Sequence, residues 1–263
     1  MKYNNLINNI NTIRKQKGHL SNAFFAGSFL ADSLNNGTLK GIDSEDLVLL
    51  IDEKPDLVRV YFYALERNSL QKVRLLLSNY NKPIIIDVVG KDPQARDLAN
   101  ILINCGFEEY SKFVRMVNDK PNMPKYLSNS KVEYANKYDK ESIMALLYSE
   151  FDPLFAHIPS QSEIEQAINK NEITVVRDDK KIIGLTFFEM ISSTNIMFRY
   201  FIVDEEFRKK GIGGDLLFYT FNSYPEAKYT LWVGTYNKAM QKYERLNFKH
   251  DGLVDYILKL KEN

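Results

Sequence analysis

The stretch FIVDEEFRKKGIGGDLL, residues 201–217, joins the end of an apolar strand to the start of a helix through a basic, glycine-rich turn. Glycine permits positive φ values and lets a ligand approach the backbone, so successive N–H groups can converge on phosphate oxygens. The N-terminus of the helix adds about half a positive charge at the same place. The stretch therefore predicts a strand–loop–helix phosphate site, although a basic turn that only caps the helix is the simpler alternative. The residues predicted to bind the ligand there are Arg208, Lys209, Lys210, Gly211, Ile212, Gly213 and Gly214.

Two widespread nucleotide-binding motifs do not fit this turn. The dinucleotide pattern GxGxxG needs a glycine three residues after Gly213, where the chain has Leu216. The Walker A pattern ends in Gly-Lys-Ser or Gly-Lys-Thr, an ending that the turn does not have. Dinucleotide-binding and P-loop folds are therefore disfavoured.

The turn instead resembles the pyrophosphate-binding signature of the GNAT N-acetyltransferases, [QR]-x-x-G-x-[GA]. Arg208, Gly211 and Gly213 stand at the three defined positions. The order of the elements from Lys140 to Leu260 is also similar to that of the family, so the resemblance covers about half the chain. It implies an α/β (α+β) fold in which helices flank a mixed, twisted sheet.

The stretch WVGTYNKAMQKYERLNF is similar to a second element of the family, N-x-x-A-x-x-x-Y-E-x-x-G-F. Asn237, Tyr243, Glu244 and Phe248 match this element, whereas the alanine is shifted by one position. Asn247 replaces the usual glycine, and asparagine is among the residues that enter the left-handed region. The resemblance places Asn237 among the cofactor-binding residues.

The resemblance also implies how the donor substrate, acetyl-CoA, would bind and react. Its pantetheine would pair with the backbone of Phe201 and Val203, in an opening beside the strand 229–234. An N–H group near Ile202 would stabilise the oxyanion, and Tyr243 would protonate the departing thiolate. For Tyr243, the alternative is an aromatic side chain that only packs on its helix face.

The acceptor amine must lose a proton before it attacks, because an ammonium group with a pKa near 10 is mostly protonated at pH 7. The family often has a glutamate at the start of the strand that leads to the phosphate loop, but the matching stretch 195–199 has no carboxylate. Glu189 and His157 are the candidate proton acceptors, with Glu189 preferred. For both, a solvated or locally hydrogen-bonded side chain is the alternative.

Residues 118–131, NDKPNMPKYLSNSK, predict an exposed connection because proline ends regular structure. The domain boundary is expected near Pro124, giving domains 1–124 and 125–263. The first half has no glycine-rich loop where the fold would place one, between Tyr63 and Lys82. It is therefore predicted to be a degenerate GNAT-like domain that does not bind the cofactor, in tandem with a catalytic one.

Hydrophobic periodicity predicts the order β-β-α-β-α-β for the first half and α-α-β-β-β-α-β-α-β-β for the second. The second half is expected to end in a hairpin around Asp251 and Gly252, and one of its helices to begin with a capping pattern at Ser162 and Glu165. The expected strands are 46–54, 56–65, 82–90, 108–117, 172–179, 180–192, 194–204 and 229–234. The expected helices are 69–80, 95–107, 140–151, 162–168 and 237–248, and the stretch 208–224 is expected to form a glycine-rich turn followed by a helix.

Composition excludes several classes of protein. With 35 Lys and Arg against 34 Asp and Glu, the net charge is +1, so nucleic acid and anionic membranes are not expected partners. A single cysteine, Cys105, and three scattered histidines predict neither a disulfide nor a metal site. The N-terminus lacks the apolar core of a signal peptide, and the longest apolar runs are too short to span a bilayer. A soluble, cytoplasmic protein is expected, and a homodimer is left open.

The sequence thus favours an acetyl-CoA-dependent N-acetyltransferase that acts on a primary amine of a small molecule, with a peptide or protein amine as the next choice. A module that binds acyl-CoA without turnover is the alternative, because the strand glutamate is missing. A third hypothesis is an aminoacyl-transferring relative with tRNA as donor. The near-neutral charge and the intact phosphate loop argue against it.

Overall fold

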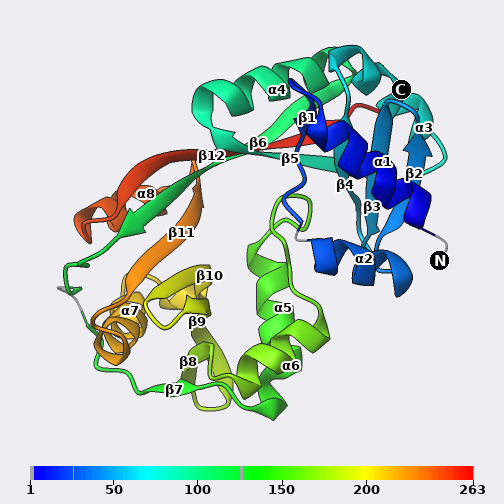
Figure 1. The fold of residues 1–263 in the computed structure, drawn as a ribbon. Helices are drawn as coiled ribbons and strands as arrows, with labels where there is room; N and C mark the ends of the chain where they lie inside the picture. The colour runs from blue at the N-terminus through cyan, green and yellow to red at the C-terminus, as the bar shows by residue number, and fades with distance from the viewer. Residues whose placement is uncertain (1–2, 26, 125–126, 263) are drawn as a thin grey trace. The chain divides into compact units, whose positions relative to one another are not determined.

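The computed structural model describes residues 3–25, 27–124 and 127–262. The chain divides into two compact units (Figure 1). The first comprises Met1–Phe113 and Leu253–Asn263, and the second comprises Val114–Gly252. Each unit is built from strands and helices, as the predicted fold class requires.

This division differs from the one expected at Pro124 because two long strands belong to both units. β6 (Phe107–Asn118) begins in the first unit and ends in the second. β12 (Lys249–Leu260) begins in the second unit and ends in the first. The expected hairpin around Asp251 and Gly252 is wrong, because both residues lie within the continuous strand β12.

In the first unit the strand order is β2-β3-β4-β5-β12, and β1 pairs with β4. β3 and β4 are antiparallel, β4 and β5 start as a parallel pair, and β12 is antiparallel to β5. The elements that precede β6 are α1 (Asn4–Lys15), β1 (Leu20–Ser21), α2 (Gly27–Asn35), β2 (Lys40–Ser44), β3 (Leu47–Glu53), β4 (Val58–Ala64), η1 (Arg67–Lys72), α3 (Val73–Leu76), β5 (Ile84–Lys91) and α4 (Asp92–Asn104).

The core of the first unit explains why β3 is almost continuously apolar. Val48 and Leu50 pack in one cluster with α1 and α2, where Leu6, Ile10 and Ile13 form the buried stripe of α1. The residues between them, such as Leu49, are also fully buried. A strand that is covered on both faces reads as a hydrophobic run rather than as an alternating pattern.

In the second unit the strand order is β11-β10-β9-β8-β7, with all neighbours antiparallel except the parallel pair β10 and β11. The elements are β7 (Val132–Tyr134), η2 (Lys137–Asp139), α5 (Lys140–Glu150), α6 (Gln161–Asn169), β8 (Ile173–Asp178), β9 (Lys181–Ser192), β10 (Asn195–Val203), η3 (Glu205–Phe207), α7 (Ile212–Ser223), β11 (Lys228–Gly234) and α8 (Ala239–Arg245).

Helices cover both faces of this sheet. Ile143 of α5 and Ile164 of α6 share a core cluster with β8 and β9. Leu217 and Phe221 of α7 pack in a different cluster with β11, which α8 joins through Tyr243. The result is a three-layer arrangement of helices, sheet and helices (Figure 1).

A β-bulge in β10 decides which side chains face which layer. Phe198 pairs with Phe188 of β9, whereas Tyr200 pairs with Phe187, so Arg199 is an extra residue. Phe198 packs in the cluster of α7, but Tyr200 and Ile202 pack in the cluster of α5 and α6. Without the bulge, all three even-numbered side chains would lie on the same face.

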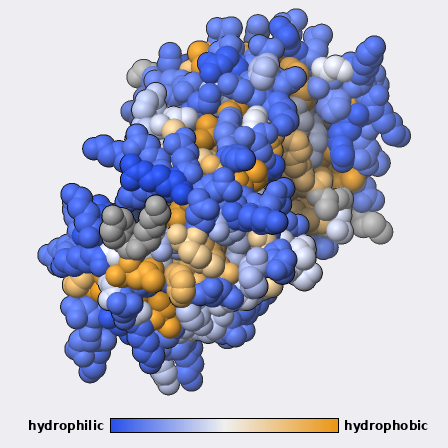
Figure 2. All heavy atoms as spheres, turned by 90° about the vertical axis from the view of Figure 1, so that its left-hand side faces the viewer, coloured by the Kyte–Doolittle hydropathy of each residue, from blue (hydrophilic) through white to orange (hydrophobic). Residues whose placement is uncertain are grey.

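The face of the molecule drawn in Figure 2 is mostly hydrophilic, with smaller hydrophobic areas between the hydrophilic side chains. Among the residues that the structure describes, no helix combines the length and the apolar character needed to cross a membrane.

Candidate functional site

The parallel strands β10 and β11 part at the middle of β10. Their pairing runs from Asn195 opposite Lys228 to Phe198 opposite Leu231 and ends there. Beyond that point β10 continues to Val203 against β9 alone. The second half of β10 therefore presents a strand edge to the side from which β11 has turned away, as the resemblance to the family implies.

The hydrogen-bond alternation of β10 shows which amides face this edge. The N–H of Asp204 donates to the carbonyl of Ile183 at 2.9 Å and continues the antiparallel ladder with β9. Ile202 shares that orientation, because hydrogen-bonded residues alternate along such a ladder. The amides of Phe201 and Val203 therefore turn toward the open edge. The N–H of Ile202 itself faces β9, so the outward N–H groups nearest to Ile202 are those of Phe201 and Val203.

The phosphate loop has the backbone that its glycines allow. Asp204 accepts a hydrogen bond from the N–H of Glu206 at 3.1 Å and so begins the single turn η3. Lys209 and Gly211 then adopt φ values of 65° and 95°, in the left-handed region. α7 starts directly after Gly211, so the first N–H groups of the helix belong to the loop.

Close packing favours glycine at Gly213 and requires it at Gly211. A Cβ on Gly213 would lie 3.2 Å from Cζ of Phe201. A Cβ on Gly211 would lie 2.5 Å from the backbone nitrogen of Ser128 and 2.7 Å from the carbonyl carbon of Leu127. The segment before β7 therefore passes against the phosphate loop, a contact that the sequence does not predict.

Asp215, in the first turn of α7, holds that segment in place. Its buried carboxylate accepts hydrogen bonds from the hydroxyl of Ser128, from the N–H of Asn129 at 3.2 Å and from the N–H of Ser130 at 3.0 Å. The sequence offered one signal for this role, an acidic residue in the first turn of a helix, where the dipole favours it.

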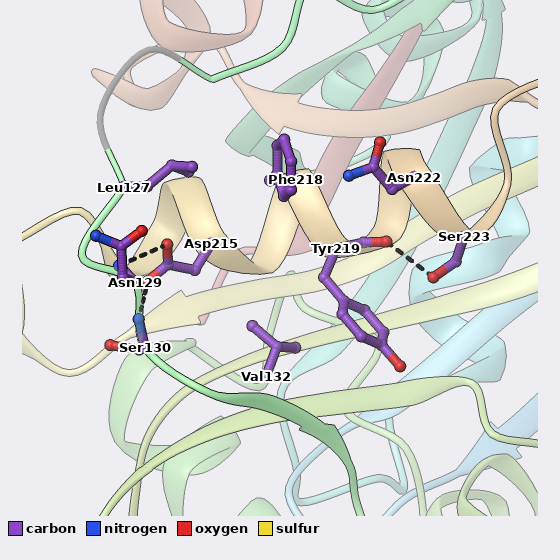
Figure 3. A pocket seen from close by; sticks show the side chains of 9 residues that line it. All are labelled: Leu127, Asn129, Ser130, Val132, Asp215, Phe218, Tyr219, Asn222 and Ser223. Atoms are coloured by element: carbon purple, nitrogen blue, oxygen red, sulfur yellow. Dashed lines mark hydrogen bonds between the residues drawn. The ribbon is translucent and has the colours of Figure 1, made fainter.

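An open cavity of about 460 Å³ lies between this segment and the outer side of α7 (Figure 3). Its lining residues are Leu127, Asn129, Ser130, Val132, Asp215, Phe218, Tyr219, Asn222 and Ser223. None of the predicted catalytic or cofactor-binding residues is among them, so this cavity is separate from the strand edge of β10.

The cations of the loop differ in how they are held. Arg208 donates from Nε to the carbonyl of Val203 at 3.0 Å and from Nη2 to Glu150 at 2.5 Å. Lys210 places its Nζ 4.7 Å from the centre of the Phe207 ring. Arg208 is thus tied to the strand edge and to α5.

Tyr243 packs against the core cluster that also contacts Phe201, so the structure brings α8 and β10 to the same cluster. Its ring meets Phe248 edge to face at 5.8 Å, and Met240 lies against the same cluster. Burial raises the pKa of Tyr243 to about 12, although the residue as a whole stays partly exposed. The hydroxyl is therefore protonated at neutral pH.

The two candidate proton acceptors are engaged differently. One carboxylate oxygen of Glu189 accepts a hydrogen bond from Nη1 of Arg199, the bulge residue, at 3.1 Å. His157 is exposed in the loop between α5 and α6, and its backbone carbonyl accepts a hydrogen bond from the hydroxyl of Tyr200. That bond fixes the loop to β10.

Asn237 has a structural role in addition to the one predicted for it. Its side-chain oxygen accepts a hydrogen bond from the N–H of Ala239 at 2.8 Å, and its own N–H donates to Gly234 at 2.9 Å. The residue thus fixes the turn between β11 and α8. Among the described residues there is no group of three or more His, Cys, Asp or Glu that could hold a metal ion.

Comparisons with known proteins agree with this geometry. Residues 169–250, which include β8 to α8 and the phosphate loop, match the model of the acetyltransferase (GNAT) domain. This part of the chain is a GNAT domain. The resemblance based on Arg208, Gly211 and Gly213 is therefore confirmed for residues 169–250, whereas the match does not extend to the first unit.

Solved structures extend the likeness in fold to most of the chain. A GCN5-related N-acetyltransferase from Kribbella flavida is 13% identical, with 92% of this chain and 98% of that chain covered and a TM-score of 0.57. One from Sphaerobacter thermophilus is also 13% identical, with coverage of 87% and 84% and a TM-score of 0.56. A tandem GNAT protein from the clavulanic acid biosynthesis pathway is 13% identical, with coverage of 83% and 80% and a TM-score of 0.54.

These structures confirm the predicted fold class, a mixed twisted sheet flanked by helices. A search among curated proteins found no significant match to the sequence.

Proposed function

We propose that the chain is an acetyl-CoA-dependent N-acetyltransferase that acetylates a primary amine of a small molecule by direct attack. The observation that supports this most is the open edge of β10 beside the glycine turn of α7, inside the GNAT domain. A peptide or protein amine is the next choice of acceptor. We expect the protein to act in the cytoplasm without a nucleic-acid or membrane partner, and a homodimer is compatible with the proposal.

The residues at the edge fit the donor. The outward amides of Phe201 and Val203 would pair with the amide groups of pantetheine, and Arg208 already satisfies the carbonyl of Val203. The loop from Lys209 to Gly214 would hold the pyrophosphate through its N–H groups and the start of α7. Bound acetyl-CoA supplies the thioester whose carbonyl carbon is attacked.

The reaction forms a bond from the amine nitrogen to that carbon, breaks the carbon–sulfur bond and releases a thiolate. A thiolate has a pKa of about 8.5, so taking a proton outright from Tyr243 would be uphill by about 5 kcal/mol. We therefore assign Tyr243 as a hydrogen-bond donor to the sulfur while the bond breaks. Glu189, His157 or solvent water would take the proton that the amine loses.

The alternative, a module that binds acyl-CoA without turnover, is favoured by two observations. Glu189 is paired with Arg199, and Tyr243 packs among apolar side chains as a purely structural residue would. Both proposals require donor binding, so only a measurement of turnover separates them.

Calorimetric titration with acetyl-CoA tests donor binding. Gly211→Glu puts a side chain and a negative charge into the loop, and it should abolish binding. Gly37→Glu is the matched control, because Gly37 also has a positive φ but no atom within 4 Å of an added Cβ. Binding that survives Gly211→Glu, or that is absent from the unchanged chain, would leave the loop as a helix cap only.

Replacement of Tyr243 by Phe tests the chemistry. The expected result is a fall in turnover of ten-fold or more, measured by release of the coenzyme thiol with a panel of amines, while the dissociation constant for acetyl-CoA holds. Unchanged turnover would remove Tyr243 from the mechanism. An absence of turnover with every amine in the unchanged chain would favour the binding module.

A further inference from the structure

The first unit contains a second pair of parallel strands that part. β4 and β5 pair only at Val58 with Ile84 and at Arg59 with Ile85. Beyond that point β5 pairs with β12 on its other side, and β4 continues to Ala64 against β3. Like β10, β4 therefore has a second half whose outer edge has lost its parallel neighbour.

In this unit the chain itself occupies the opening. β1 pairs with the end of β4, with Leu20 opposite Ala64 and Ser21 opposite Tyr63. The next residue is Asn22, whose side chain is buried. Its amide nitrogen donates to the carbonyl of β4 residue Val60 at 3.1 Å and to the carbonyl of β5 residue Asp87 at 3.0 Å. Asn22 thus bridges the two strands at the point where they separate.

The polar groups along this edge of β4 are satisfied by the same short segment. The N–H of Phe62 donates to the side-chain oxygen of Asn22 at 2.8 Å. The carbonyl of Phe62 accepts a hydrogen bond from the hydroxyl of Ser21 at 2.7 Å. On β10, the corresponding outward groups belong to Phe201 and Val203 and face the edge that we assign to the donor.

The point at which β4 and β5 separate also leaves no room for a ligand. Arg59, in the last residue pair of β4 and β5, forms a buried ion pair with Asp87. After β4 the chain enters the turn η1, whose segment Arg67–Lys72 contains no glycine. An extended ligand would therefore have to displace bonded side chains and would find no phosphate loop.

We infer that Ser21 and Asn22 are a built-in occupant of the strand opening in the first unit, in the position that an extended ligand would take. The edge of β4 is satisfied from within the chain, and the first unit holds no acyl donor. The expected number of bound acetyl-CoA molecules rests on the proposed function, because it assumes that the second unit binds one. The expected stoichiometry is one acetyl-CoA per chain.

A disulfide tests where the segment lies. Leu20→Cys and Ala64→Cys, in a chain that carries Cys105→Ala, place two thiols directly opposite each other, within the Cα range that a disulfide spans. Oxidation should join them without changing the number of acetyl-CoA molecules bound or their affinity. Leu20→Cys alone is the control. Failure to form the disulfide, or a loss of bound acetyl-CoA on oxidation, would overturn the inference.

Amide exchange tests the role of Asn22. In Asn22→Ala the N–H of Phe62 loses its acceptor, and its exchange should be at least ten-fold faster, while amides of β11 are unchanged. Asn9→Ala is the matched control, because Asn9 also bonds the backbone of the first unit but lies outside the opening. Ser21→Ala, which removes the bond to the carbonyl of Phe62, serves if Asn22→Ala does not fold.

Equal exchange at Phe62 in the Asn22 variant and in the unchanged chain would overturn the inference, as would a second acetyl-CoA site per chain. If the unchanged chain bound no acetyl-CoA, the proposed function would fail. The disulfide and the exchange rates would still decide whether the opening is filled.

Discussion

Arg199 shows how one residue determines which face of the sheet the following side chains of a strand occupy. As the extra residue of a bulge, it moves Tyr200 and Ile202 to the face of α5 and α6 and leaves Phe201 and Val203 on the face of α7. It also pairs with Glu189. Apart from Arg199, every residue of β10 from Ile196 to Val203 is apolar or aromatic, so the sequence gives no sign of the change of face.

A second residue with an unusual environment is Asp255, in the part of β12 that belongs to the first unit. Burial, together with repulsion from Asp87, raises the pKa of Asp255 well above its usual range, although Arg59 opposes the shift. Because the folded pKa exceeds the unfolded one, this group's contribution to stability is complete below the unfolded pKa of about 3.9 and is lost as the pH rises through the folded pKa.

Asp255→Asn keeps the shape without the charge, so it should raise the melting temperature above the folded pKa. The free energy of unfolding should gain up to about 1.4 kcal/mol for each pH unit of the shift. Thermal melts of the variant and the unchanged chain between pH 4 and 9 measure this, with the exposed Asp97→Asn as control. A melting temperature lowered equally at every pH would contradict the assignment.

At the scale of elements, α7 is held from two sides. Its inner face is buried against the sheet, and Asp215 in its first turn bonds the segment before β7. Replacing Asp215 by Ala removes the acceptor of three hydrogen bonds, from the hydroxyl of Ser128 and from the N–H groups of Asn129 and Ser130, none of which is fully buried. This should lower the free energy of unfolding by about 1–2 kcal/mol at neutral pH.

Urea denaturation measures that loss, and Asp215→Asn, which retains one acceptor oxygen, should lose less. A change below about 0.5 kcal/mol for Asp215→Ala would show that the tether does not stabilise the folded state.

The elements around the phosphate loop could be predicted closely, because local signals set them. The expected strand before the turn and the expected helix after it are confirmed by β10, which ends at Val203, and by α7, which begins at Ile212. The start of α6 was predicted two residues late. The capping box is formed by Ser160 and Glu163, which have the same spacing as the predicted pair.

What the sequence could not show depends on partners that are distant along the chain. Asp251 and Gly252 are a typical hairpin signal, yet they lie within β12, because its next residues pair with β5 more than 150 positions earlier. Gly252 does adopt a positive φ of 89°, as a glycine in a hairpin turn often does, but here this residue lies within a strand. Local sequence patterns likewise do not predict that Asn22 hydrogen-bonds to the edge of β4.

At the scale of the whole molecule, the two units exchange strands along the chain. Residues 114–118 of β6 belong to the second unit, and residues 253–260 of β12 return to the first. A cut in the connection between them therefore leaves each fragment with a strand that completes the other unit.

A protease site inserted after Met123 tests this exchange. After cleavage, the fragments 1–123 and 124–263 should elute together under native conditions and separate only in concentrated urea, because β12 remains paired with β5. A chain that ends at Gly252 is the control, and its fragments should separate more readily. Fragments that separate at once in native buffer would show that the exchanged strands do not hold the units.

The pairing of β12 with β5 also determines the order in which the two units can complete their folding during translation. All residues of the second unit, up to Gly252, precede the segment that β5 needs as its neighbour. Domains commonly fold from the N-terminus onward during synthesis. Here the first unit lacks its strand β12 until Leu253–Leu260 have been translated. The GNAT domain is therefore the first part of the chain that can fold completely during synthesis.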